Sequence, residues 1–294
     1  RRSRRRVAAA ILCTVLVLAA AALLKIFVIG TAGEAHHVAL AYTEESGDTL
    51  SLNVYCLFGP NAFYGWAMDE TEDGVVSFTA REVRASPLHT NDQIDLEVPL
   101  EGLKEVWVCG RLCWQDGTPI SDSTLALYNA QTPYVGNNSA VGRVLAAVDT
   151  WYGPPIVDYT ISLQTSAEPY GLTIHFDDVT AHILCAGKSI DDRMYAVAPA
   201  LLALIGNLGQ VQWTYAAPDG TAVTRSVTLE EVDAALPDWI AAYDLDAGAD
   251  WTAPESVKDY AASPAAVQQL IDLIDFGLYV VTVEDGTNVF NPWP

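Results

Sequence analysis

The chain has 294 residues, of which 15 are Lys or Arg and 37 are Asp or Glu, so its formal net charge is −22. Six basic residues lie within the first 25 positions and all acidic residues follow them, so the rest carries nine basic and 37 acidic residues, a charge of −28. Such a charge repels phosphates and anionic headgroups. It excludes nucleic acid as a partner and argues against docking of this part on lipid.

The N-terminus combines a basic cluster with a long apolar run. Residues 1–6 read Arg-Arg-Ser-Arg-Arg-Arg, and the apolar run continues to Ile29. About 18 apolar residues can cross the roughly 30 Å hydrocarbon core of a bilayer as a helix, and the arginines keep their end in the cytoplasm. We expect a basic cytoplasmic stub over 1–6, a transmembrane helix over 7–29 and a linker over 30–36, with the remainder extracytoplasmic.

A cleaved secretory signal is the alternative to a retained anchor. The apolar core of such a signal spans roughly 7–15 residues and is followed by small residues. Here the run passes Lys25, whose side chain can reach the membrane interface, before it meets Gly30. The length favours retention, so the predicted location is the cell membrane, with a single pass and a cytoplasmic N-terminus.

Residues 37–121 contain short runs in which apolar and polar residues alternate, separated by turn signals such as Ser46-Gly47-Asp48. Alternation has the period of a half-buried strand. We therefore expect an antiparallel β-sandwich module here. Its predicted strands are Val38–Thr43, Thr49–Phe58, Val75–Val83, Gln93–Val98 and Glu105–Trp114.

Four cysteines lie beyond the apolar run, at Cys56, Cys109, Cys113 and Cys185. They are too sparse for a disulfide framework. On one predicted strand, Cys109 and Cys113 are about 13 Å apart, too far to bridge each other. Pairing of Cys56 with one of them across a sheet and free buried thiols remain the two alternatives.

Residues 122–294 alternate helical and strand-like patterns, which predicts an α+β domain and makes the whole chain α+β. Asn138 is the expected N-cap of the first helix, and the second helix is expected to leave through Gly206-Asn207 in a left-handed conformation. The predicted helices are Ala140–Val148, Met194–Ile205, Thr228–Tyr243 and Pro264–Ile274. The predicted strands are Asp158–Gln164, Tyr170–Phe176, Val179–Cys185, Val211–Tyr215 and Ala222–Val227, followed by a hairpin of Tyr279–Val283 and Asn288–Phe290.

The stretch Thr132–Gly142 reads TPYVGNNSAVG and resembles the opening signature of a bacterial family, the domain of unknown function 4825 (DUF4825). Three later stretches are similar as well, at Ala167–Leu172, Ala200–Asn207 and Tyr260–Pro264, so the resemblance covers about residues 128–274. The resemblance implies a membrane-attached bacterial protein without an established activity. Its signature residues are Tyr134, Gly136, Asn138 and Ser139, and packing is the alternative to a groove lined by the first two.

The sequence contains no His-Glu-x-x-His, no Gly-x-Ser-x-Gly and no phosphate-binding glycine loop. It therefore predicts no catalytic residue and no bound cofactor. His175, Asp177 and His182 are a weak candidate for a divalent-metal or general-base site, because a hairpin could bring His182 to the strand face that the other two share. Polar residues on the solvent side of a hairpin are the alternative.

A second weak candidate is a partial calcium loop. Asp244, Asp246, Asp250 and Glu255 supply spaced carboxylate oxygens, which suit Ca²⁺. The turn-glycine position is occupied by Ala249. An ordinary acidic loop is the alternative.

The predicted function is that of a membrane-anchored, extracytoplasmic, non-catalytic protein that senses or binds a ligand or another protein. Its expected partners are the lipid bilayer around the N-terminal helix and, outside it, a basic protein or a cell-wall component. A metal-assisted hydrolase is one alternative. The other is a cell-wall or glycan-binding module, in which sandwich aromatics stack on sugar unless they belong to the core. These aromatics are Tyr64, Trp66, Trp107 and Trp114.

Overall fold

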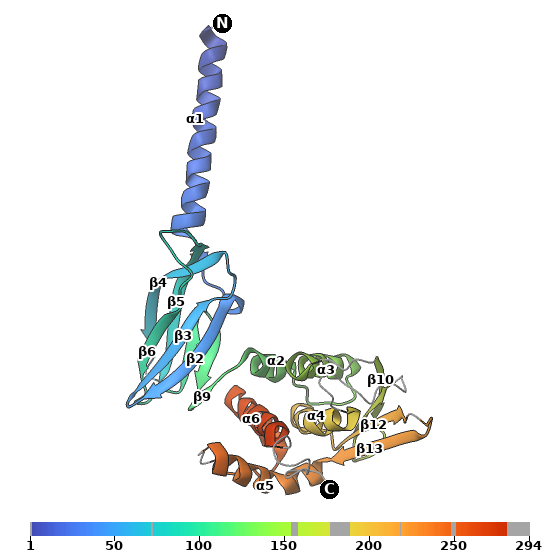
Figure 1. The fold of residues 1–294 in the computed structure, drawn as a ribbon. Helices are drawn as coiled ribbons and strands as arrows, with labels where there is room; N and C mark the ends of the chain where they lie inside the picture. The colour runs from blue at the N-terminus through green and yellow to red at the C-terminus, as the bar shows by residue number, and fades with distance from the viewer. Residues whose placement is uncertain are drawn as a thin grey trace. The chain divides into compact units, whose positions relative to one another are not determined.

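The computed structural model describes residues 2–71, 73–153, 158–176, 189–217, 219–247 and 251–280 (Figure 1). The chain divides into two compact units, one up to Pro119 and one from Ile120 onward. Each unit has a hydrophobic core of its own. The predicted fold class, α+β with an N-terminal apolar helix, is confirmed.

The N-terminal helix consists of α1 (Arg2–Leu24) and a π-helical turn, η1 (Lys25–Ile29). The 24-residue stretch Arg6–Ile29 is long and apolar enough to cross a membrane, and none of it is buried inside the protein. Its side chains therefore lack a protein core to pack into. Lipid would supply the missing apolar surroundings.

The rest of the first unit consists of two sheets whose apolar faces share one core. Leu52 and Val98 of one sheet contribute to this core together with Phe78 and Val106 of the other. The smaller sheet has the strand order β2-β3-β6, and in the larger one β1-β5-β7-β8-β9 are joined by β4, which pairs with β5. The strands are β1 (Thr31–Ala32), β2 (Val38–Ser46), β3 (Thr49–Cys56), β4 (Asn61–Glu70), β5 (Val75–Arg84), β6 (Ile94–Pro99), β7 (Glu105–Val108), β8 (Arg111–Gln115) and β9 (Thr118–Pro119).

The sandwich differs from the predicted one in three ways. β4 was not predicted, because its residues do not alternate past Gly65, where φ is +64° and the register shifts. β5 and β7 pair in parallel, because β6 between them belongs to the other sheet. The predicted strand Glu105–Trp114 is a hairpin that turns at Cys109 and Gly110, which both have positive φ.

The 13 Å separation expected between Cys109 and Cys113 assumed that both lie on one strand. In the structure, Cys109 lies at the turn of the hairpin and Cys113 lies on β8. In the structure, Cys56, Cys109 and Cys113 form no disulfide, and Cys185 lies outside the described residues. The predicted linker 30–36 is attached to the sheet, because β1 pairs with β5 and a 3₁₀ turn, η2 (Ala35–His37), follows it.

The second unit contains a four-stranded sheet of order β10-β11-β12-β13. Its two hairpins are antiparallel, whereas β11 and β12 are parallel, which requires a crossover connection that includes α4. The elements are α2 (Asp122–Ala130), α3 (Asn138–Tyr152), β10 (Tyr159–Gln164), β11 (Gly171–Phe176), α4 (Ile190–Leu204), β12 (Gln210–Ala216), β13 (Ala222–Thr228), α5 (Leu229–Ala247), η4 (Val257–Ala262) and α6 (Pro264–Val280). The four predicted helices are present, and α2 and the 3₁₀ helix η4 add to them.

The helix ends correct two sequence predictions. Asn137, rather than Asn138, is the N-cap of α3, and its side-chain oxygen accepts the amide hydrogen of Ala140. Helix α4 does not end in a left-handed residue, because its C-cap, Ile205, is extended. The start of α5 agrees with the sequence, since Thr228 and Glu231 form reciprocal capping hydrogen bonds.

Three predicted strands lie partly or wholly outside the described residues. The run Val179–Cys185 lies wholly outside them. Residues Tyr279 and Val280, predicted to begin a hairpin, are the last turn of α6, and the rest of that hairpin lies outside the described residues.

Candidate functional site

Two of the stretches that resemble the family signature, Thr132–Gly142 and Ala200–Asn207, meet at the C-terminal end of α4. Thr132 donates its amide hydrogen to Leu204, and Gly206 donates its own to Thr132, at 2.9 and 2.8 Å. The side chain of Asn207 accepts the amide hydrogen of Val135 at 2.7 Å. Each of these hydrogen bonds involves at least one backbone group. Together they hold residues 132–135 against residues 204–207.

Lys258 completes this junction from the 3₁₀ helix η4. Its Nζ donates to the carbonyl oxygens of Leu202, Ile205 and Leu208, the last two at 2.7 and 2.8 Å. Carbonyl groups at the C-terminal end of a helix have no partner within the helix, and they favour a cation. Burial lowers the pKa of Lys258 to about 8. The lysine therefore has a structural role at this helix end.

The predicted signature residues lie around this junction. Tyr134 is 65% exposed, and Gly136 is exposed as well, with an ordinary 3.5 Å approach of its Cβ position to the Thr165 methyl group. Asn138 and Ser139 form the first turn of α3 and are exposed. Among these four residues, Tyr134 is the one that presents a large side chain to solvent.

The four-stranded sheet has two chemically different faces. One face is apolar and packs on the core through residues such as Leu172, Ile174 and Trp213. The register places hydroxyl and amide side chains side by side on the other face, none of them buried. This outer face comprises Thr160, Ser162, Thr173, His175, Gln212, Thr214, Thr224 and Ser226.

The outer face contains no carboxylate, lysine or arginine at these positions. Among the described charges of this unit, Asp191 of α4 accepts the Trp213 indole hydrogen at 2.6 Å on the side of the core. In a protein with a net charge of −22, this face is a neutral surface of hydrogen-bond donors and acceptors.

His175 lies at the centre of the outer face and joins two neighbouring strands. Its Nε2 is 2.9 Å from the Ser162 hydroxyl on β10, and its Nδ1 is 2.9 Å from the Thr214 hydroxyl on β12. The other members of the predicted metal site, Asp177 and His182, lie outside the described residues. Within the described residues no three His, Cys, Asp or Glu side chains are grouped to hold a metal ion.

The Ser162–His175 contact has the geometry of a nucleophile beside a base. A hydroxyl, that of Thr214, occupies the place where a carboxylate orients and stabilises the imidazole in such enzymes. The amides of β11, which lies between β10 and β12, take part in sheet pairing, so the backbone around His175 is not directed at a developing oxyanion. The arrangement fits hydrogen bonding to a ligand better than acyl transfer.

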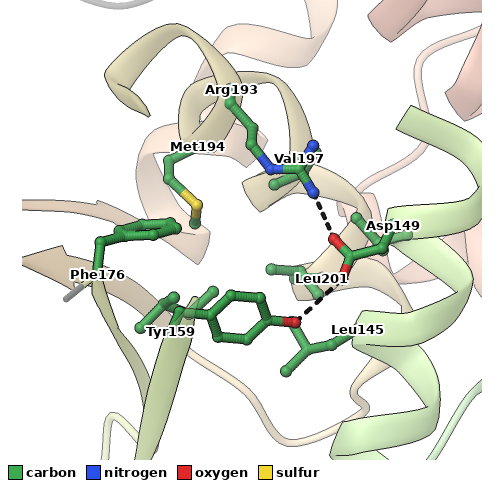
Figure 2. A pocket seen from close by; sticks show the side chains of 10 residues that line it. Leu145, Asp149, Tyr159, Phe176, Arg193, Met194, Val197 and Leu201 are labelled. Carbon is green, nitrogen blue, oxygen red and sulfur yellow. Dashed lines mark hydrogen bonds and ion pairs between the residues drawn. The ribbon is translucent and has the colours of Figure 1, made fainter. Parts of the chain in front are cut away.

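A small cavity lies beneath the opposite, apolar face of the sheet, between α3 and α4. Figure 2 shows Asp149, Tyr159 and Arg193 at one side of it and apolar side chains around the rest. The space open to the centre of a water molecule is about 10 Å³, which is enough for about one water. The cavity is therefore too small for an organic ligand.

The polar side of this cavity is a buried ion pair. Arg193 Nη2 lies 2.5 Å from Asp149 Oδ1, and Tyr159 donates to Asp149 Oδ2 at 3.1 Å. Burial lowers the pKa of Arg193 and raises that of Asp149, and burial together with Asp149 raises the pKa of Tyr159 to about 12. Because the partners come from α3, α4 and β10, the cluster stabilises their packing.

The predicted calcium loop begins inside a helix. Asp244 and Asp246 belong to α5, which continues to Ala247, and the Asp244 carboxylate accepts the Trp251 amide hydrogen at 3.4 Å. Asp250 lies outside the described residues, and Glu255 follows in an irregular segment. Helical backbone at the first two positions does not provide the loop geometry that the prediction assumed.

The four aromatic residues of the predicted sugar-stacking platform make separate contacts within the sandwich. Trp114 is buried in the sandwich core and donates to Glu45 at 3.3 Å. Trp66 packs partly against the same core, Trp107 donates to Glu105 at 2.7 Å, and the Tyr64 ring stacks on His89 with 4.3 Å between the ring centroids. These contacts account for all four aromatics within the sandwich.

The family comparison covers the first part of the second unit. Residues 127–226 match the family model DUF4825, a domain of unknown function. The match confirms the resemblance over three of the four signature stretches, while Tyr260–Pro264 lies beyond it. The DUF4825 segment includes the four-stranded sheet up to Ser226 and therefore all eight residues of the outer face. No curated protein and no solved structure matches the chain.

Sequence reasoning identified His175 but neither of its partners. Ser162 and Thr214 are ordinary residues in alternating strands, and only the register of β10, β11 and β12 shows that they flank the imidazole. A usable signal was present, because the polar positions of all four strands carry mostly hydroxyl and amide side chains and no acid.

Proposed function

We propose that this protein is a membrane-anchored, extracytoplasmic binding protein whose outer sheet face recognises a neutral, hydroxyl-rich ligand, such as a cell-wall glycan strand. The N-terminal helix of membrane-spanning length supports the anchor, and the preceding arginines support a cytoplasmic N-terminus. The outer face, an uncharged array of hydroxyl and amide groups around His175, carries the assignment of ligand class.

Charge and size distinguish this ligand class from others. An anionic ligand needs cationic side chains, and a cationic one needs carboxylates; the outer face has neither. A neutral polyol both donates and accepts hydrogen bonds, as do Ser, Thr and Gln side chains. An extended strand of sugars also suits a flat sheet better than it suits the one-water cavity beneath.

The test measures retention of the full chain, in nanodiscs, on insoluble peptidoglycan and on a neutral polysaccharide. We expect retention that is lost in the double variant Thr173→Val, Thr214→Val, because valine keeps the shape and strand preference of threonine but has no hydroxyl. Thr79→Val, at an exposed position of β5 in the first unit, is the matched control and should be retained like the unmodified chain.

Equal retention of the double variant and the unmodified chain would refute the assignment to the outer face. Absence of retention on both polymers would refute the ligand class. A serine-reactive fluorophosphonate that labels Ser162 would instead favour a serine hydrolase, since such labelling requires a nucleophile activated by His175.

A further inference from the structure

The end of the sandwich that faces the membrane can be located from strand register. Thr31 pairs with Glu82 and Ala32 with Arg81, antiparallel. Residues before Thr31 therefore extend past the C-terminal end of β5, beyond Arg84. The loops that begin where β5 ends and where β4 starts point the same way as the chain that leads to the N-terminal helix.

Side-chain contacts tie the helix end to this edge of the sheet. The Tyr64 hydroxyl is 2.5 and 2.8 Å from the carbonyl oxygens of Val28 and Ile29, and Arg81 Nε donates to Ile29 at 2.6 Å. A side chain on the Cα of Gly30, whose φ is +66°, would overlap the Glu82 carbonyl. The last turn of the helix is thus held against the sheet.

Two loops at this end expose large apolar side chains. Leu57 and Phe58 follow β3 with 58% and 55% of their surface exposed, and Leu88 follows β5 with 72% exposed. Both loops are near the helix end: the Phe58 ring lies 4.9 Å from His37, and Tyr64, which binds the helix end, stacks on His89. Exposed apolar side chains in one place commonly mark an interaction surface.

The charges at this end differ from those of the chain as a whole. Arg81 and Arg84 are exposed, whereas Glu82 is buried, 2.7 Å from His37 and 2.5 Å from the Asn61 amide. The exposed acids close by in sequence are Glu34, which lies 3.5 Å from His36, and Asp92, which accepts a hydrogen bond from the Thr90 hydroxyl. The net charge of −28 beyond the membrane argues against lipid docking in general, but this end has a different local balance.

We infer that the loops carrying Leu57, Phe58 and Leu88 insert into the lipid interface and seat the sandwich directly on the bilayer, with Arg81 and Arg84 at the headgroups. The partner is the bilayer that holds the N-terminal helix, so the inference rests on the anchor in the proposed function. Apolar side chains beside basic ones are the composition by which proteins bind the membrane interface. The short segment 30–36, paired to β5, keeps the module close to that surface.

The experiment uses the full chain in nanodiscs that contain a phosphatidylcholine with a diazirine in its acyl chain. After photolysis, mass spectrometry locates lipid adducts. We expect adducts on α1 and on the peptides that contain Leu57, Phe58 and Leu88, but not on the peptide that contains Met68. Met68 is the matched control because it is 54% exposed and lies toward the other end of β4.

A triple variant, Leu57→Ser, Phe58→Ser, Leu88→Ser, should lose the loop adducts and keep those on α1, with the same melting temperature. Met68→Ser should keep both. Adducts on α1 without adducts on the loops of the unmodified chain would overturn the inference, as would equal labelling at Met68. Absence of adducts on α1 would instead refute the anchor itself.

Discussion

The C-terminal end of α4 and the outer sheet face belong to the same unit but use polar residues in opposite ways. At the end of α4, Asn207 and Lys258 satisfy backbone groups that would otherwise be buried without partners. On the outer face, the hydroxyl groups of Ser162 and Thr214 contact the imidazole of His175, a side chain rather than the backbone. Polar groups of the first kind are required for folding, whereas those of the second kind remain available to a ligand.

This difference explains why the recognisable sequence pattern does not reveal the function. Three of the signature stretches lie in or beside the packed junction, where few side chains can make the required contacts. At the positions of the outer face, folding requires only a polar residue that favours strands. Its choice of side chains is therefore the better guide to a ligand.

The largest effect is expected at Lys258. Replacement of Lys258 by Met should lower the free energy of unfolding by about 3 kcal/mol, because the carbonyl groups at the end of α4 lose a charged donor. Chemical denaturation of the full chain in detergent measures this change. Lys104→Met, at an exposed position, should change it by less than about 0.5 kcal/mol. Equal effects of the two replacements would contradict the structural role of Lys258 at the end of α4.

The same residue predicts a pH dependence. Burial lowers the folded-state pKa of Lys258 to about 8 from its ordinary value of 10.5, so between these values the unfolded chain binds more protons than the folded one. The lysine's contribution to stability therefore rises with pH across this window. The difference in unfolding free energy between the unmodified chain and Lys258→Met should be larger at pH 9.5 than at pH 7. A constant difference would show that the pKa is not lowered.

A smaller effect is expected at Gly206. A Cβ there would lie 3.2 Å from both the Cα and the carbonyl oxygen of Pro133, which is closer than backbone atoms accommodate without a shift. Gly206→Ala should destabilise the protein by about 1–2 kcal/mol. Gly142, in the middle of α3, has nothing within 4 Å of its Cβ position, and Gly142→Ala should stabilise by about 0.5–1 kcal/mol. Thermal unfolding distinguishes the two signs.

The smallest effect is expected on the outer face. Ser162→Ala removes the hydroxyl that contacts His175 Nε2, but water can replace it because Ser162 is exposed. The unfolding free energy should change by less than about 0.5 kcal/mol, while retention on the polymer that binds the protein should fall. A decrease in the unfolding free energy of more than about 1 kcal/mol would show that Ser162, like Lys258 at the end of α4, is required for folding.

Local patterns predicted the elements whose signal lies within a few neighbouring residues. The capping pair Thr228–Glu231 marked the start of α5, and alternation in Tyr159–Gln164 marked β10. The hairpin between β7 and β8 escaped prediction because Cys109, a residue that rarely adopts positive φ, occupies the turn at +49°. Likewise, the helical backbone at Asp244 is incompatible with the calcium loop that its carboxylate spacing suggested.

The sequence by itself determined the membrane-length helix, the division into a β-rich part and an α+β part, and the acidic surface, since these depend on composition and on periods of two to four residues. Tertiary structure decided the rest. It alone brought Lys258 to the end of α4, hydroxyls to both sides of His175 and two apolar loops to the helix end. These pairings join residues far apart in the chain, and their free energy comes from packing and register that no local pattern encodes.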